Sequence, residues 1–274
     1  MFGAFENARR QRTVVRGPIG ERQGEGHVSI LPLGPVGVAR QRSHIVLCHD
    51  GHVTITILWD VDGTLLLNSF SGGGELYHLA VERTVGRELH PPMPRTHGKP
   101  DGLILSEMLT HFGLDDSLHE RARTTLDQLS DERAQAGDRR ALAPGVTDAL
   151  RAMTARGWHN ALLTGNSLVR ARVKLEGAGL GSEWFDWDRS FFGATAHHRS
   201  DITRAARAAL PDETLVIIGD TPRDGEAAQA AGLPFIAVAT GVFSVDELRD
   251  TGAQLVVADL AGSLDDVLAA IDAL

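Results

Sequence analysis

The sequence predicts an α/β protein: a parallel β-sheet flanked by helices, with a helical module inserted into it. Short apolar runs of strand length occur at 55–59, 159–163 and 215–218, and each ends abruptly in polar residues. Such continuous runs are typical of buried parallel strands, which are covered on both faces. Helical patterns separate the runs, and further runs at 235–238 and 255–257 complete the expected strands. This alternation favours a parallel sheet covered by helices.

The first 52 residues differ from the rest of the chain. They carry scattered arginines and glycines and no sustained periodicity, which predicts a poorly ordered extension. Val28–Leu33 resembles a short edge strand, although Pro32 weakens that interpretation. A basic arm for an anionic partner and a start site placed too far upstream stay open as alternatives.

The helical module lies between about Glu75 and Arg140. Its apolar spacing predicts one helix reaching toward Gly86, a second over 103–112 and a third over 118–129. Pro144–Gly145 marks the return to the α/β pattern. We therefore predict a core made of 53–70 and 142–274 and an insertion at 71–141, entered through a flexible stretch that includes Gly72–Gly74.

Composition excludes several function classes. The chain of 274 residues has a net charge of −9, which argues against nucleic acid as the main partner. No apolar run approaches the roughly 20 residues of a membrane span, and no secretory signal follows the N-terminal arginines, so a cytoplasmic protein is expected. The single cysteine, Cys48, excludes internal disulfides and a cysteine-built zinc site, and we interpret it as a buried or incidental thiol.

Polar residues at three strand ends point to a common site. Asp60 and Asp62 follow the first run, Thr164 ends the second, and Asp220 with Asp224 follows the third. Parallel α/β sheets place ligands beyond the carboxyl ends of their strands. Four crowded carboxylates require a hard divalent cation, and Mg2+ fits best. Carboxylates, a hydroxyl and a metal near a helix N-terminus suit phosphoryl chemistry, whereas a plain turn and a plain helix cap are the simpler alternatives.

Three motifs carry a resemblance to a known family: Asp60-Val61-Asp62-Gly63-Thr64, Leu163-Thr164-Gly165-Asn166, and Gly219-Asp220-Thr221-Pro222-Arg223-Asp224. In order and spacing they resemble the haloacid dehalogenase (HAD) superfamily of hydrolases. The inserted module is similar to the helical cap of the phosphoglycolate phosphatase-like branch. The resemblance covers roughly 53–274 and implies a Rossmann-like core with an α-helical cap, Mg2+ as cofactor and a small phosphorylated metabolite as substrate.

The resemblance also implies residue roles. Asp60 would be the nucleophile that forms an aspartyl-phosphate, and Asp62 would protonate the leaving oxygen and then activate water. Mg2+ would be held by the Asp60 carboxylate, the Asp62 backbone carbonyl and Asp220, with Asp224 in the outer layer around the ion or reaching it through a water molecule. Thr164 would bind phosphoryl oxygens with the amides after it. The expected substrate-binding residues are Gly63, Thr64, Gly165, Asn166 and Lys99.

One position departs from the family pattern. The family places a lysine, or sometimes an arginine, before the helix that precedes the third motif, and the segment 196–201 has no lysine. We assign the role to Arg199, which can hold phosphate oxygens with two nitrogens. Lys174 is the second candidate, with a solvated helix residue as its plain interpretation. The neighbouring pair His197–His198 is interpreted as polar loop rather than a metal site.

Substrate choice is expected to lie in the cap. The segment Thr96–Asp101 aligns by position with a cap loop that faces the active site in relatives, and Lys99 would meet an anionic substrate tail unless it is a surface lysine. Gly72–Gly74 would let the cap open and close. The leading function is a Mg2+-dependent phosphomonoesterase, a monomer or homodimer. A sugar phosphomutase and a non-catalytic binding protein of the same fold are the alternatives, whereas dehalogenase and phosphonate chemistry do not use a second acid such as Asp62.

Overall fold

The computed structural model describes residues 54–67, 73–90 and 96–274. The predictions for the first 52 residues, including the edge strand at Val28–Leu33 and the thiol of Cys48, lie outside these ranges, as does Gly72. Gly73 and Gly74 do not form the predicted flexible stretch, because they begin helix α1 (Gly73–Val85).

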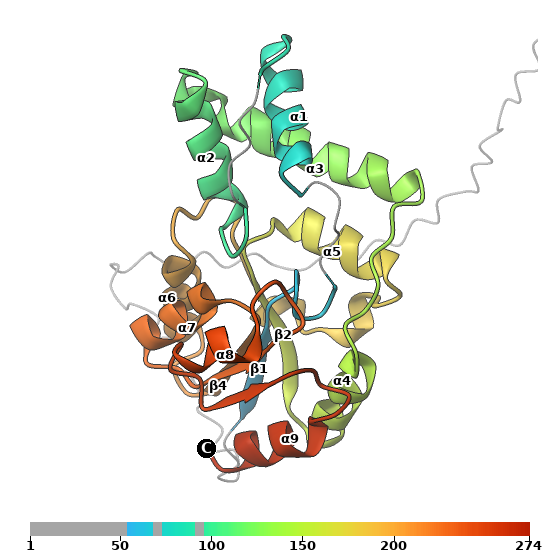
Figure 1. Cartoon of the computed structure of the whole chain (residues 1–274), viewed down its shortest axis with the longest axis vertical. Helices are drawn as coiled ribbons and strands as arrows, with labels where there is room; N and C mark the ends of the chain where they lie inside the picture. The colour runs from blue at the N-terminus through green and yellow to red at the C-terminus, as the bar shows by residue number, and fades with distance from the viewer. Residues whose placement is uncertain (1–53, 68–72, 91–95) are drawn as a thin grey trace, which may run out of the picture. The chain divides into compact units, whose positions relative to one another are not determined.

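A six-stranded sheet forms the centre of the core, in the order β3-β2-β1-β4-β5-β6, and every neighbouring pair is parallel (Figure 1). The strands are β1 (Ile55–Trp59), β2 (His159–Thr164), β3 (Phe191–Phe192), β4 (Thr214–Gly219), β5 (Phe235–Val238) and β6 (Leu255–Val257). Because β1 pairs with both β2 and β4, the polar residues that follow these three strands emerge side by side at one edge of the sheet.

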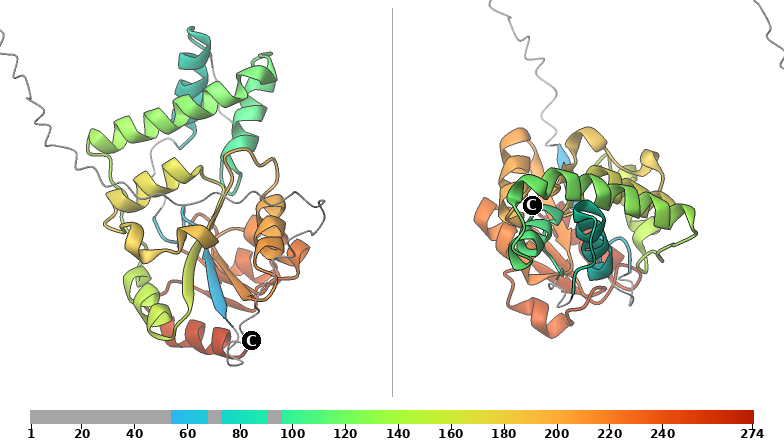
Figure 2. Two further views of the ribbon diagram at one scale, coloured as in Figure 1. Left: turned by 180° about the vertical axis from the view of Figure 1, so that it is seen from behind. Right: turned by 90° about the horizontal axis from the view of Figure 1, so that it is seen from above.

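Helices cover both faces of the sheet, which explains why its strands are apolar throughout rather than alternating. In β1, Ile57 and Trp59 belong to the hydrophobic cluster under α4, α5 and α9, whereas Leu58 belongs to the cluster under α6, α7 and α8. The six helices are α4 (Val146–Ala155), α5 (Leu168–Gly177), α6 (Arg199–Ala209), α7 (Pro222–Ala231), α8 (Val245–Arg249) and α9 (Leu264–Asp272). Figure 2 shows them from behind and from above.

The inserted module is helical, as predicted. It consists of α1, α2 (Asp101–His111), the short 3-10 helix η1 (Asp116–Leu118) and α3 (His119–Gln135), which extends six residues beyond the predicted end at Leu129. These helices share a hydrophobic cluster of their own, in which Leu76, Leu105 and Leu126 are buried. On the core side, α3 packs against α5. The predicted fold class, a helix-flanked parallel sheet with an inserted helical cap, is confirmed, while the boundaries of the cap at 71 and 141 stay a prediction.

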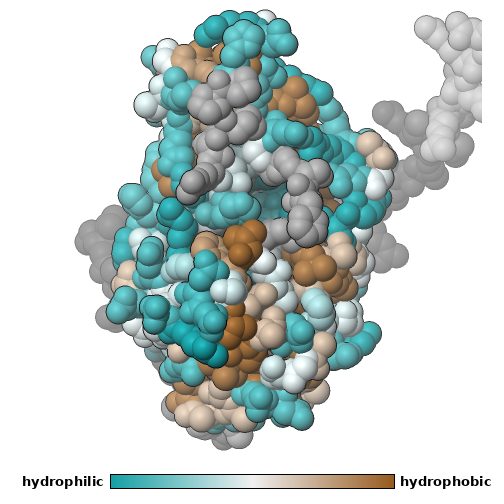
Figure 3. Space-filling model, in the orientation of Figure 1, coloured by the Kyte–Doolittle hydropathy of each residue, from teal (hydrophilic) through white to brown (hydrophobic). Residues whose placement is uncertain are grey.

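The exposed surface carries few large hydrophobic side chains. Leu168, Val169, Val242 and Leu274 are the exposed ones among the described residues. On the face in Figure 3, hydrophilic residues dominate and hydrophobic ones form small patches. None of the helices in the described ranges has both the length and the apolar character needed to cross a membrane.

Candidate active site

Three carboxylates meet beyond the carboxyl ends of β1 and β4. Asp60 follows β1, and its backbone nitrogen donates to Ile218 O (3.0 Å). Asp220 follows β4, and Asp224 lies in the first turn of α7, where its Oδ2 accepts from Thr221 Oγ1 (2.7 Å) in a capping box. All three side chains are buried, and each offers an oxygen within 4.8 Å of the others.

The charge of this cluster is only partly balanced by the protein. Burial raises the pKa of Asp60 to about 6 against the opposing effect of Arg199, and Asp224 and Asp62 add to the increase. Burial and the neighbouring Asp60 and Asp224 also raise the pKa of Asp220 well above its ordinary value. Further positive charge would therefore stabilise the ionised cluster.

The residues present fit a hard divalent cation. The donors that converge are all carboxylate oxygens, which Mg2+ prefers. Asp224 Oδ1 is buried and forms an ion pair with Arg199 Nη2 at 2.5 Å, so a metal ion bound there would share this oxygen with the guanidinium. Asp60, Asp220 and Asp224 are the only such group among the residues in 54–67, 73–90 and 96–274. The predicted His197–His198 pair is exposed and belongs to no such group, consistent with its interpretation as polar loop.

Arg199 is the cation beside the cluster. It is the first residue of α6, and its Nη2 lies 2.9 Å from Asp60 Oδ1 and 2.5 Å from Asp224 Oδ1. Nη2 also donates to Leu163 O (3.0 Å), which ties the side chain to the end of β2. Arg199 therefore lies close enough to Asp60 to contact a phosphoryl group bound to that carboxylate.

Asp62 lies apart from this cluster and has its own cations. Its Oδ1 accepts from Arg140 Nη1 (2.6 Å), and its Oδ2 accepts from Lys174 Nζ (2.6 Å) and Asn166 Nδ2 (2.7 Å). Burial alone would raise the pKa of Asp62, but Lys174, Arg140 and these hydrogen bonds outweigh it and hold the pKa well below its ordinary value. Lys174 therefore pairs with Asp62, whereas Arg199 pairs with Asp60 and Asp224. The two candidates for the cationic phosphate contact thus lie beside different carboxylates.

Gly63 and Thr64 contact Asp220 rather than the open cavity. Gly63 has φ +93°, and a Cβ there would lie 2.1 Å from Asp220 Oδ2, so only glycine fits. Thr64 Oγ1 donates to Asp220 Oδ1 (3.1 Å). A Cβ at Gly241 would come within 1.7 Å of Asp220 Oδ2. Two glycines and a threonine therefore fix the position of this carboxylate, and neither Gly63 nor Thr64 is among the residues that line the cavity.

The loop Thr164–Ser167, between β2 and α5, forms the opposite side of the site. We name it the phosphate loop because of its predicted role. Thr164 is buried, and its Oγ1 accepts from Asn166 Nδ2 (2.9 Å). Ser167 is the N-cap of α5, and its hydroxyl accepts from Arg170 N (3.1 Å). The amide of Ser167, one of those predicted to hold phosphate, donates instead to Asp101 Oδ2 (2.8 Å).

A cavity of 660 Å³ joins these groups, and both the core and the cap line it. Asp60, Asp62, Thr164 and Arg199 face it from the core. The cations around it are Lys99, Arg140, Arg170, Lys174 and Arg199. Lys99 lines the cavity as predicted, but its Nζ is paired with Glu107 Oε2 at 2.6 Å.

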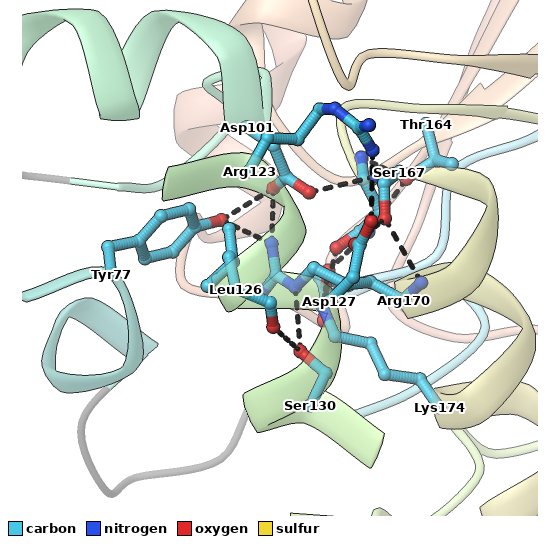
Figure 4. Close-up of polar contacts among 12 residues, drawn as sticks. Tyr77, Asp101, Arg123, Leu126, Asp127, Ser130, Thr164, Ser167, Arg170 and Lys174 are labelled. Carbon is cyan, nitrogen blue, oxygen red and sulfur yellow. Dashed lines mark hydrogen bonds and ion pairs between the residues drawn. The ribbon is translucent and has the colours of Figure 1, made fainter. Parts of the chain in front are cut away.

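A second polar cluster, which no sequence pattern predicts, lies between the cap and α5 (Figure 4). Asp101 Oδ1 accepts from Tyr77 Oη (2.6 Å) and from Arg170 Nη1, and the guanidinium of Arg170 lies over the Tyr77 ring at 4.7 Å. Ser167 Oγ donates to Asp127 Oδ1. No motif or periodicity joins these residues, and only the position of Asp101 in the predicted cap loop hinted at a role.

Family models and known proteins match a large part of this chain. The family model for haloacid dehalogenase-like hydrolases matches residues 57–229, and a second model, for HAD-hydrolase-like proteins, matches residues 196–263. A phosphoglycolate phosphatase from Rhodospirillum rubrum is 28% identical over 230 residues, which cover 77% of this chain and 90% of that protein.

Solved structures share the fold at low sequence identity. A HAD hydrolase from Entamoeba histolytica superimposes with a TM-score of 0.59 at 18% identity, over 80% of this chain and all of that chain. CbbY from Rhodobacter sphaeroides, solved in complex with phosphate, has a TM-score of 0.53 at 21% identity, over 77% of this chain and 96% of that chain.

Proposed function

Because the chain belongs to the haloacid dehalogenase-like hydrolase family, it is a hydrolase of the phosphatase type, and we propose that it hydrolyses a small phosphomonoester through an aspartyl-phosphate on Asp60, with Mg2+ as cofactor. One observation carries the proposal: Asp60 opens onto the cavity while sharing a buried site with Asp220, Asp224 and Arg199. A carboxylate surrounded in this way can approach a phosphoryl group only because cations offset the repulsion between them.

The first half-reaction transfers the phosphoryl group to the protein. A carboxylate oxygen of Asp60 attacks phosphorus, the bond to the ester oxygen breaks, and Asp62 gives that oxygen a proton. In the second half, Asp62 takes a proton from water, whose oxygen attacks phosphorus and breaks its bond to Asp60. Phosphate leaves, and both aspartates return to their starting states.

Both half-reactions depend on positive charge around Asp60. Asp60, Asp220 and the Asp62 carbonyl would hold Mg2+, with Asp224 beside them, and the bound ion supplies charge that offsets these carboxylates and the phosphoryl oxygens. Arg199 adds a fixed positive charge next to Asp60. Thr164 supplies a buried hydroxyl at the end of β2 for the phosphoryl group.

Asp62 needs to change partners during the reaction. Both of its carboxylate oxygens are occupied by Arg140, Lys174 and Asn166. Because these partners hold its pKa well below the ordinary value, Asp62 is ionised in this arrangement. Its side chain therefore has to release at least one of them and take up a proton from water before it can protonate the leaving oxygen. Arg140 and Lys174 thereby control when Asp62 is available.

The substrate is proposed to be a small metabolite, with phosphoglycolate as the first to test. The cavity volume of 660 Å³ is typical of small-molecule sites. The Rhodospirillum rubrum relative is named a phosphoglycolate phosphatase, and it matches this chain over 90% of its own length. Lys99 lines the cavity from the cap side and would meet an anionic tail if Glu107 released it.

The deciding experiment measures phosphate release from a panel of phosphomonoesters that includes phosphoglycolate, with Mg2+ and with EDTA. We expect metal-dependent release that Asp60→Asn abolishes. Asp212→Asn is the matched control, because Asp212 is exposed in the turn before β4 and remote from the acid cluster. Release that persists in Asp60→Asn would exclude the aspartyl-phosphate route.

A sugar phosphomutase is the second candidate, because the two aspartates and the helical cap that such an enzyme uses are all present. In that case the phosphoryl group on Asp60 returns to the sugar instead of passing to water. Incubation with a hexose phosphate separates the two, since a mutase yields an isomer and a phosphatase yields free phosphate.

A further inference from the structure

The cap contacts the phosphate loop where helices α2 and α5 begin, and at each helix start backbone amides donate hydrogen bonds to acceptors across this contact. Helix α2 starts after Pro100, which provides no side-chain cap, so its first amides need other acceptors. Core carbonyls supply them: Asp101 N donates to Gly165 O (2.8 Å), and Gly102 N donates to Gly193 O (3.1 Å). In return, Ser167 N at the start of α5 donates to the Asp101 carboxylate (2.8 Å).

The carboxylate of Asp101 is held by a buried cation. Asp101 is 1% exposed and Arg170 is 4% exposed, and the two form an ion pair across the contact between cap and core. Arg170 Nη1 also donates to Tyr77 Oη (2.8 Å), and its Nε donates to Ser130 Oγ (3.1 Å). A buried pair is tolerated when further hydrogen bonds satisfy both charges, as they do here. Because these bonds engage its guanidinium, Arg170 lines the cavity as a support rather than as a substrate ligand.

Main chain from the cap and from the core packs closely against Gly165 of the phosphate loop. A Cβ at Gly165 would lie 2.9 Å from Lys99 O and 2.9 Å from Pro100 Cα. A Cβ at Gly193 would lie 2.6 Å from Gly165 O, so the loop is enclosed on two sides by other main chain.

We propose that Asp101 is a positioning residue for the phosphate loop, so that the loop acquires its binding geometry only when the cap is docked. The inference rests on the proposed function in one respect, namely that Thr164–Ser167 binds the phosphoryl group. Asp101 acts through Ser167 and not on the substrate. Cap docking and loop order are then one event, since the same carboxylate takes part in both.

Two double variants isolate the acceptor at position 101. Asp101→Asn/Arg170→Met and Asp101→Ala/Arg170→Met both remove the buried charge pair, so neither leaves an uncompensated charge. Only the asparagine variant keeps an oxygen that can accept from Ser167 N. The two proteins therefore differ in the feature that matters and serve as controls for each other.

Two measurements read the result: the affinity for orthovanadate and for inorganic phosphate in the presence of Mg2+, and amide hydrogen exchange of the peptide spanning 164–168. We expect the alanine variant to bind both anions about tenfold more weakly than the asparagine variant. This ratio corresponds to about 1.4 kcal/mol, which is the loss of one hydrogen bond between uncharged groups. We also expect faster exchange over 164–168 in the alanine variant alone.

The outcomes separate this inference from the proposed function. Equal anion affinities and equal exchange in the two variants would refute the positioning role. If the wild-type protein binds neither anion, the proposed phosphate site is wrong, and the exchange measurement still decides whether Asp101 orders the loop. Should both variants be unfolded, the single variants Asp101→Ala and Asp101→Asn, compared with each other in the same two measurements, decide the question, because both leave Arg170 equally unpaired and only the asparagine keeps the acceptor.

Discussion

Gly241→Ala is the most direct test of how the chain positions Asp220. An added Cβ would lie 1.7 Å from Asp220 Oδ2, whereas real Cβ atoms essentially never come within 3.0 Å of another heavy atom. The carboxylate therefore has to move by at least about 1.3 Å, the difference between these distances. Asp220 is 1% exposed, and Thr64 holds its other oxygen, so the displacement carries it out of its present position.

A shift of that size is incompatible with direct metal ligation, because ligand distances vary by only about 0.2 Å in working sites. Moving even a supporting group typically costs about 10- to 100-fold in metal affinity, so we expect Gly241→Ala to weaken Mg2+ binding at least about 100-fold. Isothermal titration with Mg2+ measures this directly, and thermal unfolding reports whether the fold survives.

Gly262→Ala is the matched control, because the nearest atom to its added Cβ, Asp259 Oδ1, lies at an ordinary 3.5 Å. It should bind Mg2+ like the wild type. A folded Gly241→Ala protein with wild-type Mg2+ affinity would show that Asp220 does not hold the metal.

Three further predictions concern the charges around the site. Arg199→Ala should lower kcat about 100-fold or more, because a fixed positive charge beside Asp60 is lost. Arg199→Lys should retain part of the wild-type kcat. A near wild-type kcat of Arg199→Ala in steady-state kinetics would contradict this prediction. Lys174→Met should raise the pKa of Asp62, since removing an opposite charge favours the protonated carboxyl. Loss of one charged hydrogen bond predicts a rise of about 1 to 2 pH units. Because Asp62 has to carry a proton in the first half-reaction, the rise should appear as an upward shift of the alkaline limb of kcat/KM against pH, and an unmoved limb would count against it. In metal-free protein, Asp60 binds its proton more tightly in the folded than in the unfolded state, so its contribution to the free energy of unfolding should fall as pH rises from about 4 to 6. Urea unfolding of the wild type and of Asp60→Asn across this pH range should show the difference. Saturating Mg2+ should remove the difference.

The sequence could locate the acids but not their partners. Asp60, Thr164 and Asp220 were predictable because each follows an apolar run, and adjacent parallel strands bring their carboxyl ends to one edge. Arg140 approaches Asp62 from 78 positions along the chain, where the main chain returns from α3. No local pattern encodes such a contact, since it depends on how the whole insertion is packed.

Helix faces limited the prediction in the same way. Lys174 lies on α5, and its spacing alone did not say whether it faces solvent, the phosphate site or Asp62. Packing of α5 against α3 decides that it reaches Asp62 Oδ2 at 2.6 Å. The prediction that Gly73 and Gly74 form a flexible stretch was wrong for a related reason, because glycine permits a loop without requiring one, and both residues begin α1.

The close main-chain contacts between cap and core also bear on how new specificities could be selected. Gly102, Gly165 and Gly193 each lie where a Cβ would meet another backbone at under 3.0 Å. A saturation library over this region should therefore lose nearly every variant at these three positions, even though none of them supplies a side chain to the site. His97 and Lys99 line the cavity from the same segment of chain, and they are the positions at which a library has room to vary. To alter the substrate range, a library would keep the three glycines fixed and randomise His97 and Lys99.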